Sequence, residues 1–298
     1  TYYEKNATSL RMGDIGYQNN LEENMGVHID YNSLEKYTAS LTKAIKEPSS
    51  EYKKIGVFSD GYYKQINENI LQIENEYYSS VRPKPDPSFT CRPSKALLRG
   101  GVNYIELRSI DNNIYINTGI DLEQMYFIEL LIIHSLFQKN DEISDKEYYE
   151  IKSNLTTVAH NGRDKNCTLK VNGRNTLLIS SLEKNLGELK KLASLMGKLT
   201  GDKNYKETIE KQIIKLKDNT KLPSNIVIDS MTKNKLSFYE YCMKNIEYQK
   251  KYFSNLDINM DIMNNLEVEI KNSLKKKDHL EVDLDESYDT YIKNYFKD

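Results

Sequence analysis

Residues 97–111 read LLRGGVNYIELRSID, and this stretch decides how the middle of the chain folds. A Gly–Gly turn precedes an alternating run, and alternation with period two predicts a β-strand. Side chains two positions apart share a strand face, so Glu106 and Arg108 would project together. Such a pair could serve a metal-bound polyphosphate, with the acid on the cation and the guanidinium on phosphate oxygens. An ordinary ion pair on a sheet face has the same appearance, and these residues alone leave both interpretations open.

The bulk composition indicates a polar globular chain. Its 298 residues are 38% hydrophobic and 29% charged, with a formal net charge of -2. Such a small net charge gives no general attraction to nucleic acid or to an anionic membrane. The longest apolar run, residues 128–137, is interrupted by a glutamate and a histidine and is too short to span a bilayer.

The cysteines and histidines do not suggest a disulfide framework or a metal site. Cys91, Cys167 and Cys242 are far apart and share no C-x-x-C spacing, which indicates a reducing compartment and a cytoplasmic location. The four histidines also lack ligand spacing, and we expect His134 to be a satisfied histidine of an apolar helix. The sequence contains no P-loop, dinucleotide-binding or nucleophile-elbow motif.

Hydrophobic periodicity and turn residues predict short elements in the first 120 residues. Asp30 or Ser33 can cap the first helix, and four prolines favour a loop after Val81. The expected elements are a helix over 34–45, strands over 54–58, 65–67 and 70–76, a turn at 59–61, a loop over 81–93 and the strand holding Glu106 and Arg108.

After Gly119 the pattern becomes helical. Asp121 should cap a nearly all-apolar helix that runs to about Gln138 and is buried on most faces. Further helices are expected over 144–159, 181–199, 205–217 and 237–254 and toward the C-terminus, and a core stripe is expected from Leu182, Leu186, Leu189, Leu192, Leu195 and Leu199. Strands followed by helices predict an α+β fold with an antiparallel sheet. Residues 1–120 would form its sheet-containing part, and residues 121–298 the mainly helical remainder of the same domain.

Four short polar clusters stand out within the first 111 residues. They are TSLRMGDIGY with Arg11, Asp14 and Tyr17, QIENEYY with Glu74, Asn75, Glu76 and Tyr78, RPKP with Arg82 and Lys84, and the IELRS strand. A strand over the second cluster would place Glu74, Glu76 and Tyr78 on one face. Acids, amides and bases at strand ends suit a wet pocket for charged small molecules and a divalent cation. An exposed sheet face with ladder pairs is the alternative.

Three blocks, ATSLRMGDIGY, LQIENEYY followed by VRPKP, and ALLRGGVNYIELRSID, resemble glutamate–cysteine ligases of the proteobacterial type. The resemblance extends over about residues 7–138, with a weaker echo at 161–163. It implies ATP-dependent ligation of L-glutamate to L-cysteine through a γ-glutamyl phosphate, the first step of glutathione synthesis, with ATP as co-substrate and more than one Mg²⁺. It also implies a funnel of curved antiparallel strands, similar to glutamine synthetase, which would be incomplete here and packed with a largely helical C-terminal half.

The resemblance implies roles for the polar clusters. Glu106 corresponds to a magnesium-binding glutamate and Arg108 to the catalytic arginine that meets the transferring phosphoryl group. Residues that line the cysteine site correspond to Arg11, Tyr17 and Tyr78. Nucleotide or phosphate binding is expected of Asn75, Arg82 and Lys84. For Glu74 and Glu76, a structural pairing with Arg82 or Lys84 is an equal alternative to a role in the site.

Ligases of this family carry a further N-terminal portion that supplies acidic metal ligands and much of the substrate pockets. One carboxylate cannot hold Mg²⁺ and ATP tightly, so we expect the lone chain to be inactive or nearly so and to need that portion. Two other functions stay open at this point. The chain could be a non-catalytic or regulatory binding module related to the ligase, or a carboxylate–amine ligase with another amine acceptor.

Overall fold

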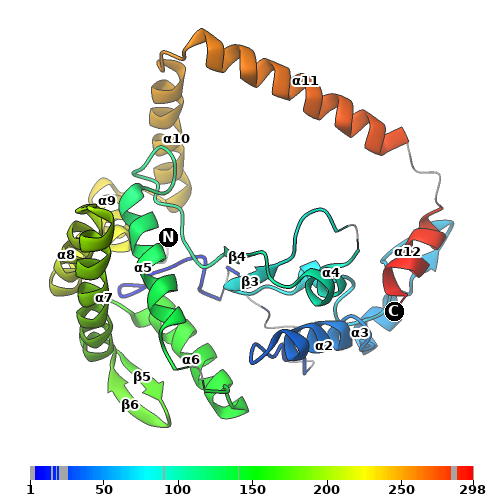
Figure 1. Cartoon of the computed structure of the whole chain (residues 1–298), viewed down its shortest axis with the longest axis horizontal. Coiled ribbons are helices and arrows are strands. Elements are labelled where there is room, and N and C mark those ends of the chain that lie inside the picture. The colour runs from blue at the N-terminus through cyan, green and yellow to red at the C-terminus, as the bar shows by residue number, and fades with distance from the viewer. Residues whose placement is uncertain are drawn as a thin grey trace.

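The computed structural model describes residues 4–14, 16–17, 19, 26–89, 91–139, 141–282 and 287–297. Figure 1 shows an open ring, in which helix α11 (Met260–Val282) spans the distance between α10 (Phe238–Ser254) and α12 (Tyr288–Phe296). Helices dominate, and every strand pair among the described residues is antiparallel, which confirms the α+β class. Those strands form three separate two-stranded sheets.

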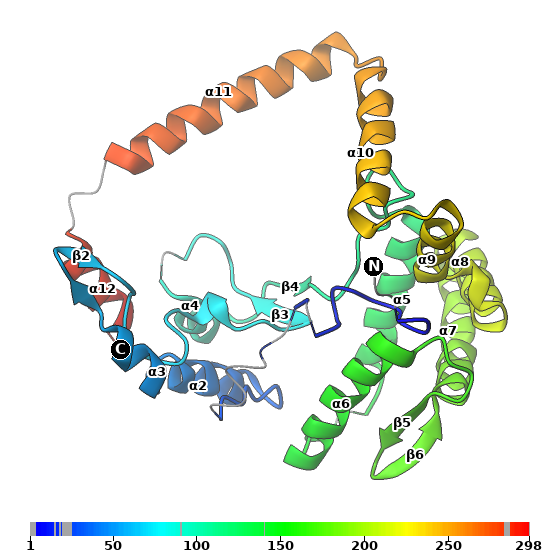
Figure 2. The ribbon, with the colours of Figure 1, turned by 180° about the vertical axis from the view of Figure 1, so that it is seen from behind.

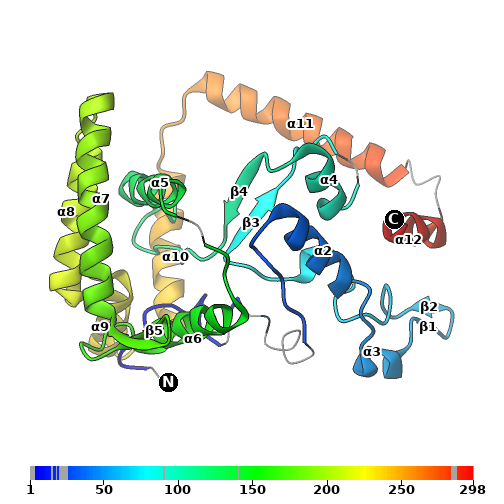
Figure 3. The ribbon, with the colours of Figure 1, turned by 60° about the horizontal axis from the view of Figure 1, so that its bottom comes forward.

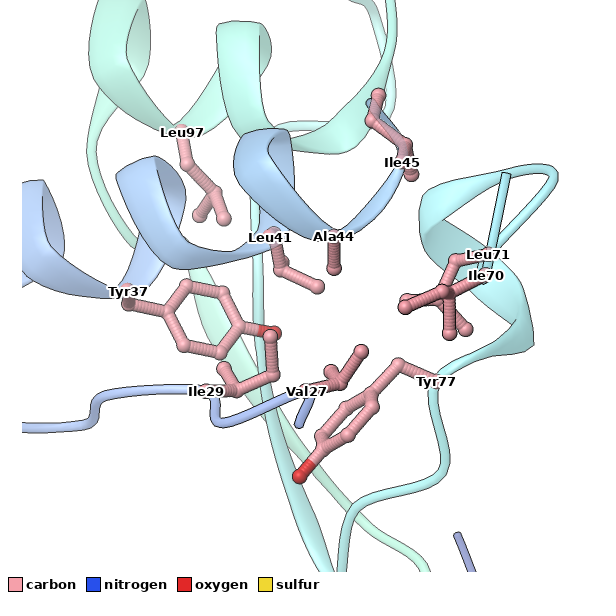
Figure 4. Packing of buried hydrophobic residues seen from close by; sticks show 10 residues of the cluster. All are labelled: Val27, Ile29, Tyr37, Leu41, Ala44, Ile45, Ile70, Leu71, Tyr77 and Leu97. Atoms are coloured by element: carbon pink, nitrogen blue, oxygen red, sulfur yellow. The ribbon is translucent and has the colours of Figure 1, made fainter. Parts of the chain in front are cut away.

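Helix α2 (Leu34–Ala44) covers the first hydrophobic core and confirms the first predicted helix. It begins after Ser33, whose side chain accepts a hydrogen bond from the Lys36 N–H. Its buried face meets residues from the loops and from helix α4 (Pro93–Gly100), as Figure 4 shows. This core consists of Val27, Ile29, Tyr37, Leu41, Ala44, Ile45, Ile70, Leu71, Tyr77 and Leu97.

The turn predicted at 59–61 is present, but the strand predicted over 54–58 is wrong over most of its length. Helix α3 (Ser50–Ile55) takes the first two residues of that stretch, and the next two lie outside any helix or strand. The Ser49 side chain caps α3 by accepting from the Tyr52 N–H. Strands β1 (Phe58–Ser59) and β2 (Tyr62–Tyr63) then form a hairpin. The two residues between them, Asp60 and Gly61, both have positive φ, as the tightest hairpin turns require.

The strands predicted over 65–67 and 70–76 are also wrong. The second stretch contains a 3-10 helix, η1 (Glu74–Glu76), and the first forms no strand. Side-chain amides take the backbone hydrogen bonds that a strand would use: Gln72 Oε1 accepts from the Ile66 N–H at 2.7 Å, and Asn67 Oδ1 accepts from the Asn69 N–H at 2.8 Å.

Strands β3 (Val81–Lys84) and β4 (Tyr104–Leu107) form the pair that carries the polar clusters. Strand β4 confirms the predicted strand. The predicted loop over 81–93 is confirmed at 85–89 and 91–92, whereas β3 occupies its first four residues and α4 begins at its last. Pro83 lies within β3, where its missing N–H is tolerated because each strand of a two-stranded sheet has a free edge. Gly101, with φ of 74°, ends α4 and turns the chain into β4.

The helical part follows the predicted order, with two additions. The elements are α5 (Leu122–Leu136), α6 (Asp145–Asn161), β5 (Thr168–Val171), β6 (Arg174–Leu177), α7 (Leu178–Thr200), α8 (Asn204–Lys217), η2 (Asn219–Lys221) and α9 (Pro223–Asn234), followed by α10, α11 and α12. The sequence analysis missed α9 and the β5–β6 hairpin. It also expected α7 to begin three residues later than it does.

A second core joins α5, α7 and α8, which Figure 3 shows at the far end of the molecule from α12. Leu186 and Leu189 of the leucine stripe are buried there, but Leu195 and Leu199 are 52% and 73% exposed. The predicted burial of α5 on most faces is wrong. Of its residues only Leu130 is buried, because α5 packs on α7 and α8 along one side. Among the described residues, no helix is long and apolar enough to cross a membrane.

Helix α12 closes the ring by returning to the N-terminal part (Figure 2). Phe296 packs against the first core, and the ring of Tyr288 lies edge-on to that of Tyr63 with centroids 4.6 Å apart. The Tyr63 hydroxyl also donates to the Asp289 carboxylate. The two parts of the chain are therefore in contact at its C-terminal end.

Candidate functional site

Glu106 lies between two cationic side chains on the β3–β4 pair. Its Oε1 is 3.0 Å from Arg108 Nε, and its Oε2 is 3.2 Å from Lys84 Nζ. The side chains keep 34%, 26% and 25% of their exposure for Glu106, Arg108 and Lys84, so a solute can reach all three. Partial burial raises the pKa of Glu106, but hydrogen bonds from Arg108 and Lys84 outweigh it and hold that pKa below its usual value. The carboxylate is therefore ionised at neutral pH.

Arg108 also contacts a stacked pair of tyrosines. Its Nη1 donates to the Tyr17 hydroxyl at 2.5 Å, and the Tyr17 ring stacks on that of Tyr78 with centroids 4.3 Å apart and planes 17° apart. The Arg11 guanidinium carbon lies 5.0 Å from the centroid of the Tyr17 ring. The structure thus brings Arg11, Tyr17 and Tyr78 together beside Arg108, although the three come from two distant clusters of the sequence.

The first cluster reaches this position by wrapping around the end of β4. Asp111 accepts from the Arg11 N–H at 3.2 Å and from the Ser9 hydroxyl at 2.5 Å, and Arg11 Nε donates to the Arg108 carbonyl. The loop is tight at Gly16, where a Cβ would lie 2.2 Å from the Arg11 carbonyl oxygen. No role was predicted for Asp111. Its place at the end of the block that contains Glu106 and Arg108 was the available signal.

Arg82 is directed into the protein. It is buried, and its Nη2 donates to the Asn75 carbonyl at 3.0 Å and to the Tyr77 carbonyl. The register places Arg82 opposite Glu106, but the ion pairs of Glu106 run to Lys84 and Arg108. Phosphate binding by Arg82 stays a prediction. In this structure its guanidinium donates to two backbone carbonyls. The side chain of Asn75 is exposed.

Glu74 holds the start of helix α4. Its side chain is 1% exposed, and its oxygens accept from the Ser94 N–H at 2.7 Å and from the Ser94 hydroxyl at 2.5 Å. Arg92 Nε lies 3.4 Å from the same carboxylate. The arrangement is structural, with Arg92 as the partner in place of the expected Arg82 or Lys84. Glu76 accepts from the Gln72 N–H at 2.6 Å and faces solvent, so the strand face predicted for this cluster does not exist.

The described residues do not form a complete metal site by themselves. Among them, no group of three or more His, Cys, Asp or Glu side chains is arranged to hold a metal ion. Mg²⁺ demands six oxygen ligands in near-octahedral geometry. Glu106 offers one carboxylate, whose two oxygens face Lys84 and Arg108. It fits as a single ligand of a cation whose other ligands come from phosphates, water or residues elsewhere.

His134 and His160 lie outside this site. His134 Nε2 is 2.9 Å from a Glu188 carboxylate oxygen, so it is a satisfied histidine as predicted. His160 lies between the carboxylates of Glu4 and Asp14. Its hydrogen bonds to these two acceptors, of which the one to Glu4 contributes most, raise its pKa. The three cysteines are free thiols.

Comparisons with known proteins agree on one family. The glutamate–cysteine ligase family model matches residues 1–158. The glutamate–cysteine ligase of Leptospira interrogans is 34% identical over 281 residues, which are 94% of this chain and 53% of that protein. The ligase of Shewanella pealeana is 33% identical over 297 residues, which are 100% of this chain and 56% of that protein. The chain therefore spans about half the length of the curated relatives it matches.

A solved structure agrees with the sequence relatives. The glutamate–cysteine ligase of Francisella tularensis, crystallised in complex with AMP, superposes with a TM-score of 0.89 at 28% sequence identity. The match takes in 98% of this chain and 57% of that one. Nearly every described element therefore has a counterpart in a longer polypeptide.

Proposed function

The chain belongs to the glutamate–cysteine ligase family, and from this premise we propose that it supplies one wall of an active site that joins L-glutamate to L-cysteine at the expense of ATP. The observation that carries the proposal is the position of Arg108, which contacts Glu106 on one side and the Tyr17 hydroxyl on the other. One guanidinium thus connects the proposed phosphoryl-transfer residues with the proposed acceptor pocket.

The reaction is a phosphoryl transfer followed by an acyl transfer. The γ-carboxylate of glutamate attacks the γ-phosphorus of ATP, and ADP leaves. The cysteine amine then attacks the acyl carbon and loses a proton as the C–N bond forms. The C–O bond to the phosphate breaks, and phosphate leaves with the former carboxylate oxygen and the electron pair of that bond. Catalysis of such transfers comes mainly from positioning and charge stabilisation. Arg108 suits this role, because a guanidinium binds two phosphoryl oxygens at once and its present partners are solvent-accessible.

The acceptor amino acid would bind against the tyrosine pair. Arg11 beside the Tyr17 ring is available to pair with the substrate carboxylate, and the stacked rings of Tyr17 and Tyr78 give one flat wall. Because the Tyr17 hydroxyl already accepts from Arg108, an acceptor bound there would lie beside the phosphoryl group to be displaced. These contacts suit a small amino acid, and cysteine is the acceptor that the names of the relatives favour.

ATP and Mg²⁺ are the expected co-substrate and cofactor. The AMP complex of the Francisella ligase supports nucleotide binding. Lys84 is a partly exposed cation that could contact the nucleotide. Asn75, which precedes Lys84 in the same part of the sequence, is an exposed amide. Glu106 would be one ligand of Mg²⁺, which when bound neutralises phosphate charge. Lys84 and Arg108 would then exchange the carboxylate for phosphate oxygens.

The remaining wall would come from the ligase portion that this chain does not represent. We propose that residues 1–120 and 121–298 act as two parts of one domain, because α12 packs against the first core. We also propose a cytoplasmic location, since free thiols are the rule there. The partners are glutamate, cysteine and ATP, with no part for nucleic acid.

Co-expression with the part of a relative that this chain does not match tests the proposal. The full chain is produced alone and together with the part of the Leptospira interrogans ligase outside the 281-residue match. We expect phosphate release that depends on glutamate, cysteine and ATP from the assembled pair, and little or none from the chain alone. An assembled pair without turnover would favour the regulatory module, and turnover with another amine in place of cysteine would favour a different acceptor.

A further inference from the structure

Asn19 makes a two-point contact with the backbone of Tyr78. Its side chain is buried, its Nδ2 donates to the Tyr78 carbonyl, and its Oδ1 accepts from the Tyr78 N–H at 2.7 Å. A primary amide satisfies a backbone donor and acceptor at the same time, as a neighbouring β-strand would. Tyr78 lies between η1 and β3, outside any helix or strand, so this contact takes the place of regular structure.

The contact fixes two chain segments whose aromatic rings meet. Asn19 belongs to the same loop as Tyr17, and Tyr17 stacks on Tyr78 at 4.3 Å. The position of the Tyr78 backbone therefore sets where the Tyr17 ring can lie. The Tyr17 hydroxyl in turn accepts from Arg108 Nη1 at 2.5 Å, while Glu106 takes Nε of the same guanidinium at 3.0 Å. The plane of the guanidinium is thus defined by two acceptors.

We propose that Asn19 is a positioning residue, which holds Tyr17 on Tyr78 and thereby aims the Arg108 guanidinium. Only the claim that this orientation of Arg108 matters for catalysis rests on the proposed function. The geometry itself is a property of this chain and can be tested without turnover. A small displacement of a group that acts by position is costly, because charge stabilisation of a transferring phosphoryl group requires its donors to be in place beforehand.

Other side chains at position 19 should not reproduce the contact. Asn19→Ala removes both hydrogen bonds. Asn19→Asp keeps the shape and the acceptor but loses the donor to the Tyr78 carbonyl, and it introduces a charge beside that carbonyl. Asn19→Gln keeps the amide but moves it by one methylene, so it should recover part of the effect only if the cavity adjusts.

The chain offers a matched control in Asn154. Its Nδ2 donates to the Lys170 carbonyl at 2.6 Å, and its Oδ1 accepts from the Lys170 N–H at 2.8 Å. This is the same two-point contact, made between α6 and the β5–β6 hairpin, with no described contact to Arg108 or either tyrosine. Asn154→Ala therefore removes equivalent hydrogen bonds without touching the proposed route.

The decisive measurement is the Nε–H signal of Arg108 in the full chain labelled with ¹⁵N-arginine. The sequence has seven arginines, and Arg108→Lys assigns the signal by its loss. We expect a shifted, slowly exchanging signal in the wild type, a move toward the position of solvated arginine in Asn19→Ala and Asn19→Asp, and no change in Asn154→Ala. Tyr17→Phe should give the same move as Asn19→Ala, since it keeps the ring and removes the acceptor.

Each outcome decides the proposal. An unchanged Arg108 signal in folded Asn19→Ala, or in Asn19→Asp should the alanine variant fail to fold, overturns it. A signal that moves in Asn19→Ala but not in Tyr17→Phe overturns the route through Tyr17. In the co-expressed enzyme, Asn19→Ala should lower kcat/KM for cysteine by about 10- to 100-fold while Asn154→Ala leaves it unchanged. If the assembled wild type shows no turnover either, the proposed function fails. The Arg108 signal, which needs no turnover, still decides the positioning role.

Discussion

Two carboxylate–arginine pairs in this molecule have the same chemistry and opposite uses. Glu74 and Arg92 have side chains 1% and 4% exposed, whereas those of Glu106 and Arg108 are 34% and 26% exposed. Glu74 also accepts two hydrogen bonds from Ser94, so its oxygens are committed to the start of α4. A carboxylate held in that way cannot exchange its partners for a substrate. The exposed pair of Glu106 and Arg108 can exchange partners for a substrate. This difference in accessibility distinguishes a candidate site from a structural pair.

The surroundings explain how the difference arises. Glu74 lies in η1 next to the start of α4, where a buried charge without a partner would be costly, and its carboxylate meets the two Ser94 donors and Arg92. Glu106 lies on a two-stranded sheet with free edges, where water and solutes take the place of protein on one side. Substitutions in the exposed pair should therefore change turnover and ligand binding, and substitutions in the buried pair should change stability.

The largest effect is expected from Arg108→Ala. Loss of a guanidinium that stabilises a transferring phosphoryl group should lower turnover of the assembled enzyme by about a thousandfold, which corresponds to about 4 kcal/mol. Phosphate release and circular dichroism would be measured on the same samples. Arg99→Ala is the control, because that exposed arginine contacts Cys91 Sγ at 3.9 Å, away from the site. Turnover that survives in Arg108→Ala removes Arg108 from the mechanism.

Glu74→Gln should affect stability most. It leaves the buried Arg92 without its opposite charge and weakens the acceptor of the two Ser94 hydrogen bonds, at a cost of about 3 kcal/mol in the free energy of unfolding. Urea unfolding monitored by circular dichroism would measure it. Glu76→Gln, two residues away and exposed, should stay within about 0.5 kcal/mol of the wild type. Equal effects of the two substitutions would contradict the structural role given to Glu74.

The sequence was sufficient where a local rule decides the structure. Ser33 and Asp121 cap the helices that their positions predict, and period two correctly placed β4 with Glu106. Each of these features depends on residues at most a few positions apart. The helical order of the second half was predictable for the same reason, because apolar spacing is a local property.

Features that depend on distant partners were not predictable in this way. Glu74 looked like a strand residue, and its burial follows from Ser94, 20 positions later. Asp111 and Asn19 bond to residues 100 and 59 positions away. Asp111 ends the block that holds Glu106 and Arg108, but the residues next to it and to Asn19 in the sequence do not reveal these partners. The predicted burial of α5 on most faces was wrong for a related reason. Apolar composition shows that a helix can be buried, but it does not show which other elements pack against it.

Glu106→Gln tests whether the exposed carboxylate binds a cation. The amide keeps the shape but loses the charge that a cation requires, so Mg²⁺-dependent ATP binding by the assembled enzyme should weaken by about 10- to 100-fold. Calorimetric titration with and without Mg²⁺ would measure it, and stability should change little because the pair is solvent-accessible. Equal loss of ATP binding in the presence and absence of Mg²⁺ would assign Glu106 to positioning Arg108 and Lys84 instead.

The smallest expected effect is the acid dependence of the exposed pair. Hydrogen bonds from Arg108 and Lys84 outweigh burial and lower the pKa of Glu106, so its contribution to stability is present above the unfolded value of about 4.3 and is lost as pH falls through the folded one. Wild type and Glu106→Gln should therefore differ by at most about 0.5 kcal/mol near neutral pH and converge in acid. Urea unfolding at several pH values would show it. A gap that persists in acid would mean that Glu106 stabilises the fold through packing, as Glu74 does, and not through an exchangeable charge.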